Sequence, residues 1–311
     1  MRRTGGVIVA AALLLDGLLG EPPERFHPTV WMGRAISAHE KLVLAHEGTA
    51  VRRAGGAVLA AALPSAAFLL CRILLRAAPG TLRPMLEAAL ISTTLSLRGL
   101  GTAARGVQTE LAEGRLEGAR KRVGEFVGRD TAGLSEGDVC RAAVESVAEN
   151  TSDGVVGPML YGYLFGAPGA LAYRAINTVD SMVGHKSPRY RDLGRAGARL
   201  DDWANLAPAR LTVLAVAAAS PAPARVLRAA RRYGPLTTSP NAGWVEAAFA
   251  GALGVRLGGT NSYGGVESRG PLLGAGRPPT THDIGRAVGL MRRICVLLAL
   301  LALLPGGTRR G

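Results

Sequence analysis

Long runs of apolar residues alternate with short polar, mostly basic segments along this chain. The longest run covers residues 54–75, which hold no charge before Arg72 and contain Pro64 as a potential kink. A helix that crosses a bilayer needs about 20 mostly apolar residues, so this run predicts a transmembrane helix. Gly5–Leu19 is a shorter apolar run interrupted by Asp16, and we interpret it as a retained first membrane segment.

Four further apolar runs are shorter or interrupted. Residues 85–97 contain Glu87, and residues 154–173 carry no Asp, Glu, Lys or Arg but many Gly and Pro. That second pattern is typical of a broken or re-entrant element rather than a regular membrane helix. With residues 211–224 and 294–304, the chain is predicted to have roughly four to six membrane elements.

The basic segment 98–129 has no long apolar run, and it predicts surface helices. Its apolar residues recur at roughly helical spacing, at Leu111, Leu116, Val123 and Val127. The whole pattern predicts an all-α fold: a polytopic integral membrane helical protein with re-entrant or broken elements and amphipathic surface helices. We expect a single membrane-embedded domain over residues 1–311.

Charge and hydropathy together argue against a soluble nucleic-acid-binding protein. The formal net charge is +14, yet hydrophobic residues make up 48% of the chain and the mean hydropathy is +0.20. Basic soluble proteins that bind nucleic acid are usually hydrophilic. Basic loops between apolar runs instead suit a protein whose loops face anionic lipid headgroups. We therefore expect a lipid bilayer as partner, no nucleic acid, and a multi-pass location in the cell (inner) membrane.

The three cysteines predict neither a metal site nor a disulfide framework. Cys71, Cys140 and Cys295 are scattered, and no pair has the spacing of metal ligands. We expect them to be small buried apolar residues.

The first polar motif is Gly128-Arg129-Asp130-Thr131. Arg129 can bind a phosphate or carboxylate in two-pronged fashion, and the glycine lets the backbone approach such a ligand. The alternative is a plain loop in which Asp130 caps a helix.

The second motif is rich in carboxylates. Glu145 and Glu149 are four residues apart and share a helix face, while Asn150 and Asp153 are three apart and share another. Carboxylates next to the uncharged run that begins at Gly154 are costly, which favours a hard-cation site. The alternative is a solvated acidic face.

The third motif places Asn177 and Asp180 on one helical face, with Lys186 about two turns later, where it could neutralise a phosphate. His185 alone is more often structural than catalytic.

The fourth motif, an Asp-Asp-x-x-Asn run, lies just before an apolar run. It contains Asp201, Asp202 and Asn205, and Arg210 follows. Acidic pairs at the mouth of a membrane helix bind Mg²⁺ and, through it, a phosphate. Arg210 could clamp an anion or extend its charged end toward water.

The last motifs are rich in turn residues. Ser239-Pro240-Asn241-Ala242-Gly243-Trp244 precedes an Ala-rich helical run, and Gly258-Gly259 and Tyr263-Gly264-Gly265 follow it. No P-loop spacing is present, so we interpret these glycines as turns.

Together these motifs resemble the adenosylcobinamide-phosphate synthase family (CbiB/CobD) of cobalamin biosynthesis. The resemblance rests on G-R-D-T, E-S-V-A-E-N-T-S-D-G, Y-R-A-I-N-T-V-D-S-M-V-G, A-R-L-D-D-W-A-N-L-A-P-A-R and S-P-N-A-G-W. The N-terminal L-D-G-L-L-G-E-P-P and the late L-G-V-R-L-G-G also look like that family. In order and spacing the likeness extends from about Leu15 to about Gly274.

The resemblance implies an integral membrane ligase that forms an amide between adenosylcobyric acid, a corrinoid, and (R)-1-aminopropan-2-ol or its O-phosphate. It implies ATP as co-substrate, Mg²⁺ as cofactor, and an association with other cobalamin-biosynthesis enzymes. The expected catalytic residues are Glu145, Glu149, Asp153, Asp180, Lys186, Asp201 and Asp202. The expected metal ligands are Asp153, Asp180, Asp201 and Asp202. The expected substrate-binding residues are Arg129, Asp130, Thr131, Asn150, Asn177, Asn205, Arg210 and Asn241.

The sequence allows two alternative functions. A membrane prenyltransferase also holds Mg²⁺ and a diphosphate between two acidic motifs, but it needs a longer apolar helical cradle. A non-catalytic membrane accessory protein like the AmpE proteins should lack the acidic motifs found here.

Overall fold

The computed structural model describes residues 2–46, 48–185, 187 and 189–304, and most of them are helical. They form two compact units. Unit 1 comprises the described parts of Met1–Ser96, Gly157–Asn205 and Ala299–Gly311; unit 2 comprises Leu97–Val156 and Leu206–Leu298. The single domain over residues 1–311 stays a prediction.

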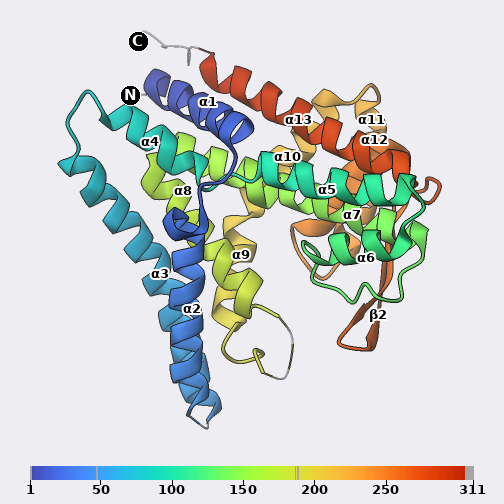
Figure 1. The fold of residues 1–311 in the computed structure, drawn as a ribbon, viewed down its shortest axis with the longest axis horizontal. Helices are drawn as coiled ribbons and strands as arrows, with labels where there is room; N and C mark the ends of the chain where they lie inside the picture. The colour runs from blue at the N-terminus through green and yellow to red at the C-terminus, as the bar shows by residue number, and fades with distance from the viewer. Residues whose placement is uncertain (1, 47, 186, 188, 305–311) are drawn as a thin grey trace. The chain divides into compact units, whose positions relative to one another are not determined.

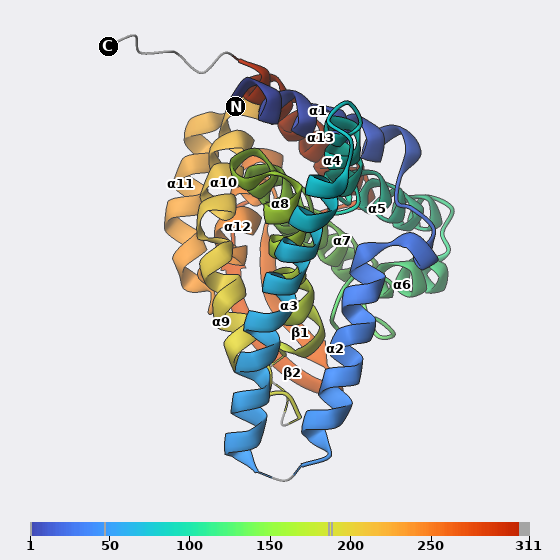
Figure 2. The same ribbon diagram turned by 90° about the vertical axis from the view of Figure 1, so that its left-hand side faces the viewer.

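Unit 1 is built from helices. They are α1 (Arg2–Leu19), α2 (Pro28–Leu44), α3 (Thr49–Ala77), α4 (Arg83–Ser92), α8 (Gly157–Val183) and α9 (Arg195–Ala204), with a short 3₁₀ turn at Glu24–Phe26. The long helices α2 and α3 run side by side and are joined by a short loop (Figures 1 and 2). Apolar residues of α2, α3 and the end of α8 form a core, which includes Ile36, Leu59, Val179 and Val183.

Glycines allow close packing around α9. A Cβ at Gly197 would lie 2.6 Å from Cγ1 of Val179 on α8, and a Cβ at Gly194 would collide with the carbonyl oxygen of Val183. Only a residue without a side chain fits such approaches. The start of α9 is therefore held directly against the end of α8, where the polar residues of both helices meet.

The broken element predicted over residues 154–173 is confirmed as broken. A π-helical turn, η2 (Ser152–Val156), precedes α8. Within α8, Gly166 leaves the helical conformation with φ 71° and ψ −168°, two residues before Pro168. A re-entrant path through a membrane stays a prediction.

Unit 2 combines helices with one β-hairpin. Its helices are α5 (Leu97–Ala112), α6 (Leu116–Gly124), α7 (Glu136–Thr151), α10 (Leu206–Ala219), α11 (Pro223–Tyr233), a 3₁₀ turn at Gly234–Leu236, α12 (Ala242–Leu253) and α13 (Thr281–Leu303) up to Leu298. The amphipathic helices predicted within 98–129 are confirmed as α5 and α6, whose Leu111 and Val123 are buried. All three cysteines are buried and free, as expected.

The all-α prediction was wrong for one segment. Residues Leu257–Tyr263 (β1) and Val266–Leu273 (β2) pair as an antiparallel hairpin (Figure 2). Gly264 and Gly265 make the two-residue turn, with φ of 59° and 80°. Positive φ at both turn positions produces the twist that hairpin strands require, and Gly-Gly adopts it without steric cost. The glycines that looked like isolated turns thus join two strands.

Two helical segments of the described chain are long and apolar enough to cross a membrane. They are α3 and the continuous helical run Glu136–Val183. Only 28% of the apolar window of α3 is buried, against 61% for the second segment, so α3 exposes large apolar side chains such as Leu70 and Ile73. The described apolar helices Gly5–Leu19, Leu206–Ala219 and Ala242–Leu253 are shorter. The polytopic arrangement therefore stays a prediction.

Candidate functional site

A chain of hydrogen bonds links α8 and α9 in unit 1. The hydroxyl of Tyr173 donates to Oδ1 of Asn205 over 2.6 Å, and the Asn205 amide donates to Oδ2 of Asp201 over 2.9 Å. The amide of Asn177 donates to Oδ1 of Asp201 over 3.4 Å. Asp201 and Asn205 are buried. The structure thus brings together three residues of the N-x-x-D and D-D-x-x-N motifs, with Tyr173 as a fourth member.

Asp180 and Asp202 lie near this chain of hydrogen bonds, and their carboxylates raise the pKa of Asp201. Burial, followed by the nearby Asp180 carboxylate, raises the pKa of Asp201 to about 7, while the hydrogen bonds from Asn205 and Asn177 oppose the shift. Desolvation and a neighbouring like charge both disfavour an ionised carboxylate. An added cation would relieve that repulsion.

The carboxylates of this cluster can hold a magnesium ion only if phosphate or water oxygens complete its coordination. Among the described residues, no group of three or more His, Cys, Asp or Glu side chains is placed to hold a metal ion by itself. Mg²⁺, however, is usually held by one or two carboxylates together with substrate phosphates and water. Asp201 with Asp180 or Asp202 meets that requirement. Asp153, the fourth predicted ligand, belongs to unit 2.

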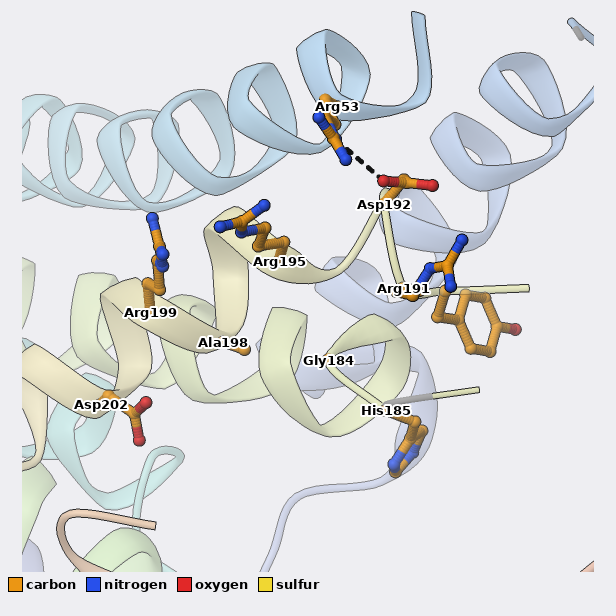
Figure 3. Close-up of a pocket in the computed structure, with 10 residues that line it drawn as sticks. Arg53, Gly184, His185, Arg191, Asp192, Arg195, Ala198, Arg199 and Asp202 are labelled. Atoms are coloured by element: carbon orange, nitrogen blue, oxygen red, sulfur yellow. Dashed lines mark hydrogen bonds and ion pairs between the residues drawn. The ribbon is translucent and has the colours of Figure 1, made fainter. Parts of the chain in front are cut away.

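A cavity of about 480 Å³ opens beside Asp202 in unit 1. Figure 3 shows Arg195, Arg199 and Asp202 on successive turns of α9. Arg53 of α3 also lines the cavity, and its Nε donates to Asp192 over 2.9 Å. A carboxylate and several guanidinium groups on one cavity suit a ligand that carries negative charge.

Of the last two residues of the third motif, the structure describes one. His185 lines this cavity and is exposed. Lys186, predicted to be catalytic, lies outside the described residues.

In unit 2, Glu145 is held between two arginines. Its Oε2 lies 2.6 Å from Nη1 of Arg129, and its Oε1 lies 3.5 Å from Nη1 of Arg141. The backbone N–H of Gly258 donates to Glu145 over 2.6 Å, and both arginines donate to Oδ1 of Asn261. Removing one partner of such a buried ion pair typically costs about 3–5 kcal/mol, so this cluster anchors β1 to α7.

Asp130 binds the tip of the hairpin. Its carboxylate accepts hydrogen bonds from the backbone N–H groups of Gly264 and Gly265 and from the hydroxyl of Ser262, at 2.7–3.0 Å. These donors hold the pKa of Asp130 below its ordinary value. Thr131 follows in the same loop. The G-R-D-T motif therefore has protein partners here, and its substrate-binding role stays a prediction.

Glu246 on α12 is a site residue that the sequence analysis did not identify. Burial, followed by the nearby Glu145 and Glu149 carboxylates, raises the pKa of Glu246 well above its ordinary value, although Arg129 and Arg141 oppose the shift. It is the one acidic residue in the apolar run 242–253. A lone carboxylate in such a run is a signal of function that was available in the sequence.

The other members of the second motif are less buried. Glu149 is exposed, and Asp153 is half-buried in the π-helical turn. The amide of Asn150 donates to the carbonyl and hydroxyl oxygens of Ser146 on its own helix.

Arg210 and Asn241 meet in unit 2. The Arg210 guanidinium donates to Oδ1 of Asn241 over 2.8 Å and to the carbonyl of Pro240 over 2.9 Å, and it lies 4.8 Å from the ring centre of Trp244. The S-P-N-A-G-W turn is therefore organised around Arg210. Both predicted substrate-binding residues lie in one place, although no spacing rule joins them.

Other residues of these clusters also escaped the sequence analysis. They are Tyr173, Arg141, Asn261, Arg53, Arg195 and Arg199. Tyr173, Asn261 and Arg53 reach their clusters through packing between distant segments. Arg195 and Arg199 precede the Asp-Asp pair at helical spacing, and Arg141 precedes Glu145 by four residues, so these three could have been identified from the sequence.

Comparison with known proteins agrees with the motifs. The family model described as CobD/Cbib protein matches residues 9–291. The cobalamin biosynthesis protein CobD of Chromobacterium violaceum is 45% identical over 300 residues, 94% of each chain. The protein of the same name from Mycobacterium tuberculosis is 42% identical over 314 residues, 99% of this chain and 98% of the other.

A CobD protein of Sinorhizobium fredii is 42% identical over 308 residues, 94% of each chain. No solved structure matches the chain. Because the family model and these relatives cover nearly the whole length, this chain belongs to the CobD/CbiB family of cobalamin biosynthesis proteins.

Proposed function

We propose that this protein is the ligase that forms an amide between adenosylcobyric acid and (R)-1-aminopropan-2-ol or its O-phosphate, with consumption of ATP. The products are adenosylcobinamide or its phosphate. Family membership supports the role in cobalamin biosynthesis. The observation that supports the chemistry is the buried, hydrogen-bonded Asp201 beside a cavity lined by arginines.

A carboxylate must be activated before an amine can attack it. The corrin carboxylate oxygen attacks the γ-phosphorus of ATP, an acyl phosphate forms and ADP leaves. The amine nitrogen then attacks the acyl carbon, phosphate leaves, and the nitrogen gives up a proton to a base. Each step moves negative charge between phosphates and carboxylates, so positioned cationic groups lower its barrier.

The side chains of unit 1 suit the binding of an anionic substrate, such as the O-phosphate of the amine. Asp201, with Asp180 or Asp202, would hold Mg²⁺, which neutralises phosphate charge when bound. Arg195, Arg199 and Arg53 line the adjacent cavity and would bind an anionic reactant. Asn177 and Asn205 orient the Asp201 carboxylate through their amide groups.

The carboxylates of unit 2 are candidates for the base that accepts the proton of the amine nitrogen. Glu145 is occupied by two arginines and a backbone N–H, so it is a weaker base candidate than Glu149 or Glu246. A carboxyl whose pKa is raised toward the working pH is an effective general base. We therefore add Glu246 to the catalytic residues predicted from the motifs.

We also propose that the protein is a multi-pass component of the cell membrane that associates with other enzymes of cobalamin biosynthesis. The exposed apolar surface of α3 supports insertion in a bilayer. A membrane location would place the product close to enzymes that act on it.

The test is amide formation by the purified protein in detergent. Adenosylcobyric acid, aminopropanol phosphate, ATP and Mg²⁺ are mixed with the protein, and product mass is followed. We expect product with the wild type and a loss of at least about 100-fold without ATP or with Asp201→Asn. Glu24→Gln, which alters an exposed carboxylate of unit 1, is the matched control and should keep full activity.

Two outcomes would contradict the proposal. Folded wild-type protein that makes no product with either the amine or its phosphate would reject the ligase. Full activity in Asp201→Asn would reject the unit 1 site. The prenyltransferase alternative would then predict turnover of a prenyl diphosphate, while the AmpE-like alternative predicts no turnover; family membership favours neither.

A further inference from the structure

Helices α11 and α12 of unit 2 pack against each other (Figure 2). A second cavity, of about 550 Å³, is lined by residues of both helices. Arg225, Arg228 and Arg232 of α11 line it. Their spacings of three and four residues place them on one face of the helix. None of the residues assigned above to catalysis, metal binding or substrate binding lines this cavity, although Gly254 and Val255 of the L-G-V-R-L-G-G motif do. The ligase site therefore does not account for it.

The positive charge of this cavity is not balanced by acidic side chains. None of its described lining residues is Asp or Glu. Arg225 is fixed by the carbonyl oxygens of Gly251, at 2.6 Å, and Ala252, at 3.2 Å, near the end of α12. Within the described chain, Arg228 and Arg232 form no salt bridge. Two guanidinium groups are thus available to an anion.

Four glycines also line the cavity. They are Gly251, Gly254, Gly274 and Gly276. Gly254 and Gly274 have φ of 71° and 106°, and a Cβ on Gly276 would collide with the carbonyl oxygen of Gly254. These positions require glycine, and their lack of side chains lets a ligand approach the backbone closely.

We propose that this cavity binds the phosphate groups of a nucleoside triphosphate through Arg228 and Arg232. Guanidinium groups bind phosphate oxygens in pairs, and the volume lies in the range of small-molecule sites. Tyr233 also lines the cavity, and its ring centre lies 5.5 Å from the Arg232 guanidinium, so an aromatic side chain is close to the proposed phosphate site. The choice of a nucleotide as the ligand rests on the proposed function, because that reaction consumes ATP. The preference for a phosphate anion rests only on the arginines of the cavity.

The test measures binding, without a corrinoid. A non-hydrolysable ATP analogue is titrated into the full-length protein in detergent and its dissociation constant is measured. The double variant Arg228→Gln/Arg232→Gln should weaken binding at least about tenfold, because the charge-assisted hydrogen bonds from both guanidinium groups to the phosphate oxygens are lost. Arg231→Gln changes an exposed arginine of the same helix that does not line the cavity, and it should bind like the wild type.

Three results would overturn the inference. They are no binding by the wild type, equal binding by the double variant, and an equal loss in Arg231→Gln. Vesicles of phosphatidylglycerol test the lipid source of phosphate: a double variant that loses vesicle binding but keeps nucleotide affinity would assign the arginines to a lipid headgroup. Amide formation is measured on the same preparations, so a failed ligase with intact nucleotide binding rejects the proposed function alone.

Discussion

Asn205 of unit 1 binds a hydrogen-bond donor, the Tyr173 hydroxyl, and a hydrogen-bond acceptor, the Asp201 carboxylate. Its carbonyl oxygen accepts from the Tyr173 hydroxyl, so its NH₂ group must face Asp201. The tyrosine and the aspartate therefore select the same orientation of the Asn205 amide. Tyr161 stacks on the Tyr173 ring, at 4.9 Å between ring centres, but donates to the backbone carbonyl of Ala204 instead.

Tyr173→Phe is expected to lower the rate of amide formation about tenfold, because Asn205 would no longer hold Asp201 in one orientation. Both Tyr173→Phe and Tyr161→Phe should lose about 1 kcal/mol of stability, the usual contribution of one hydrogen bond. Only the first should change activity. Thermal unfolding and steady-state kinetics of the two variants check this, and an equal effect of both on activity would show that Tyr173 acts through packing alone.

Glu246 provides a prediction of pH dependence. Its raised pKa means that its carboxyl binds a proton at pH values where an ordinary glutamate is already ionised. A base works only when deprotonated, so kcat/KM should rise with pH through the pKa of Glu246 and level off above it. Glu246→Gln should lower kcat/KM about 100-fold and remove that rise.

The control for Glu246 is Glu267→Gln, which changes an exposed glutamate of β2 in the same unit. Its pH profile should match that of the wild type. A Glu246→Gln profile that keeps the rise would assign the titration to another group and exclude Glu246 as the base.

Which site residues can be predicted from sequence depends on how they reach the site. Asn177, Asp201 and Asn205 were predicted because acidic and amide side chains repeat at helical spacing next to apolar runs. Arg141 and Asn261 are 120 positions apart and meet only through the packing of β1 on α7. No local pattern encodes that contact. For Glu145, type and position suggested a base, and its catalytic role stays a prediction. Its partner Arg141 lies four residues earlier on the same helix, a spacing that could have indicated the ion pair, whereas the contact with Arg129 could not be inferred from local spacing.

At the scale of elements, the break in α8 depends on one glycine. Gly166 has φ 71° and ψ −168°, a conformation that an L-residue with a side chain rarely adopts. The following backbone N–H, of Ala167, donates to Oε1 of Glu87 over 3.3 Å instead of continuing the helix. A Cβ at Gly166 would also collide with that Glu87 carboxylate.

Gly166→Ala is therefore expected to destabilise the protein by about 1–3 kcal/mol, the usual cost of a residue held in a disfavoured backbone conformation. The matched control is Gly17→Ala in α1 of the same unit, where nothing lies within 4 Å of an added Cβ. That change should be neutral or slightly stabilising, since alanine favours a helix. Denaturant unfolding in detergent compares the two, and equal stability of both variants would contradict the strained conformation.

The elements that apolar patterns predicted best are those with long uninterrupted runs. Residues 54–75 lie inside α3, and the Gly- and Pro-rich run 154–173 contains a real break. The hairpin was missed because its strands are poor in the alternating apolar residues that mark a strand: β1 is Leu-Gly-Gly-Thr-Asn-Ser-Tyr. The Gly-Gly pair between Tyr263 and Val266 was the available signal.

For the whole molecule, the two units divide the predicted site residues between them. Asn177, Asp180, Asp201, Asp202 and Asn205 belong to unit 1; Arg129, Glu145, Asp153, Arg210 and Asn241 belong to unit 2. Each unit contains its own charged clusters and its own arginine-lined cavity. Sequence motifs identified both sets but could not show that they belong to two compact units, because segments of the two units alternate along the chain.

The membrane location is a property of the whole molecule that one helix can test. Helix α3 exposes Leu70 and Ile73, and little of its apolar span is buried. A charged residue in the middle of a bilayer helix costs about 2.5–3.5 kcal/mol. The double variant Leu70→Glu/Ile73→Glu should therefore weaken membrane insertion of α3. We expect wild-type protein to stay in membranes washed with alkaline carbonate and the double variant to be partly released. Leu236→Glu, at an exposed position outside both candidate spans, should be retained like the wild type. Release of the wild type itself would show that the apolar face of α3 packs against protein rather than lipid.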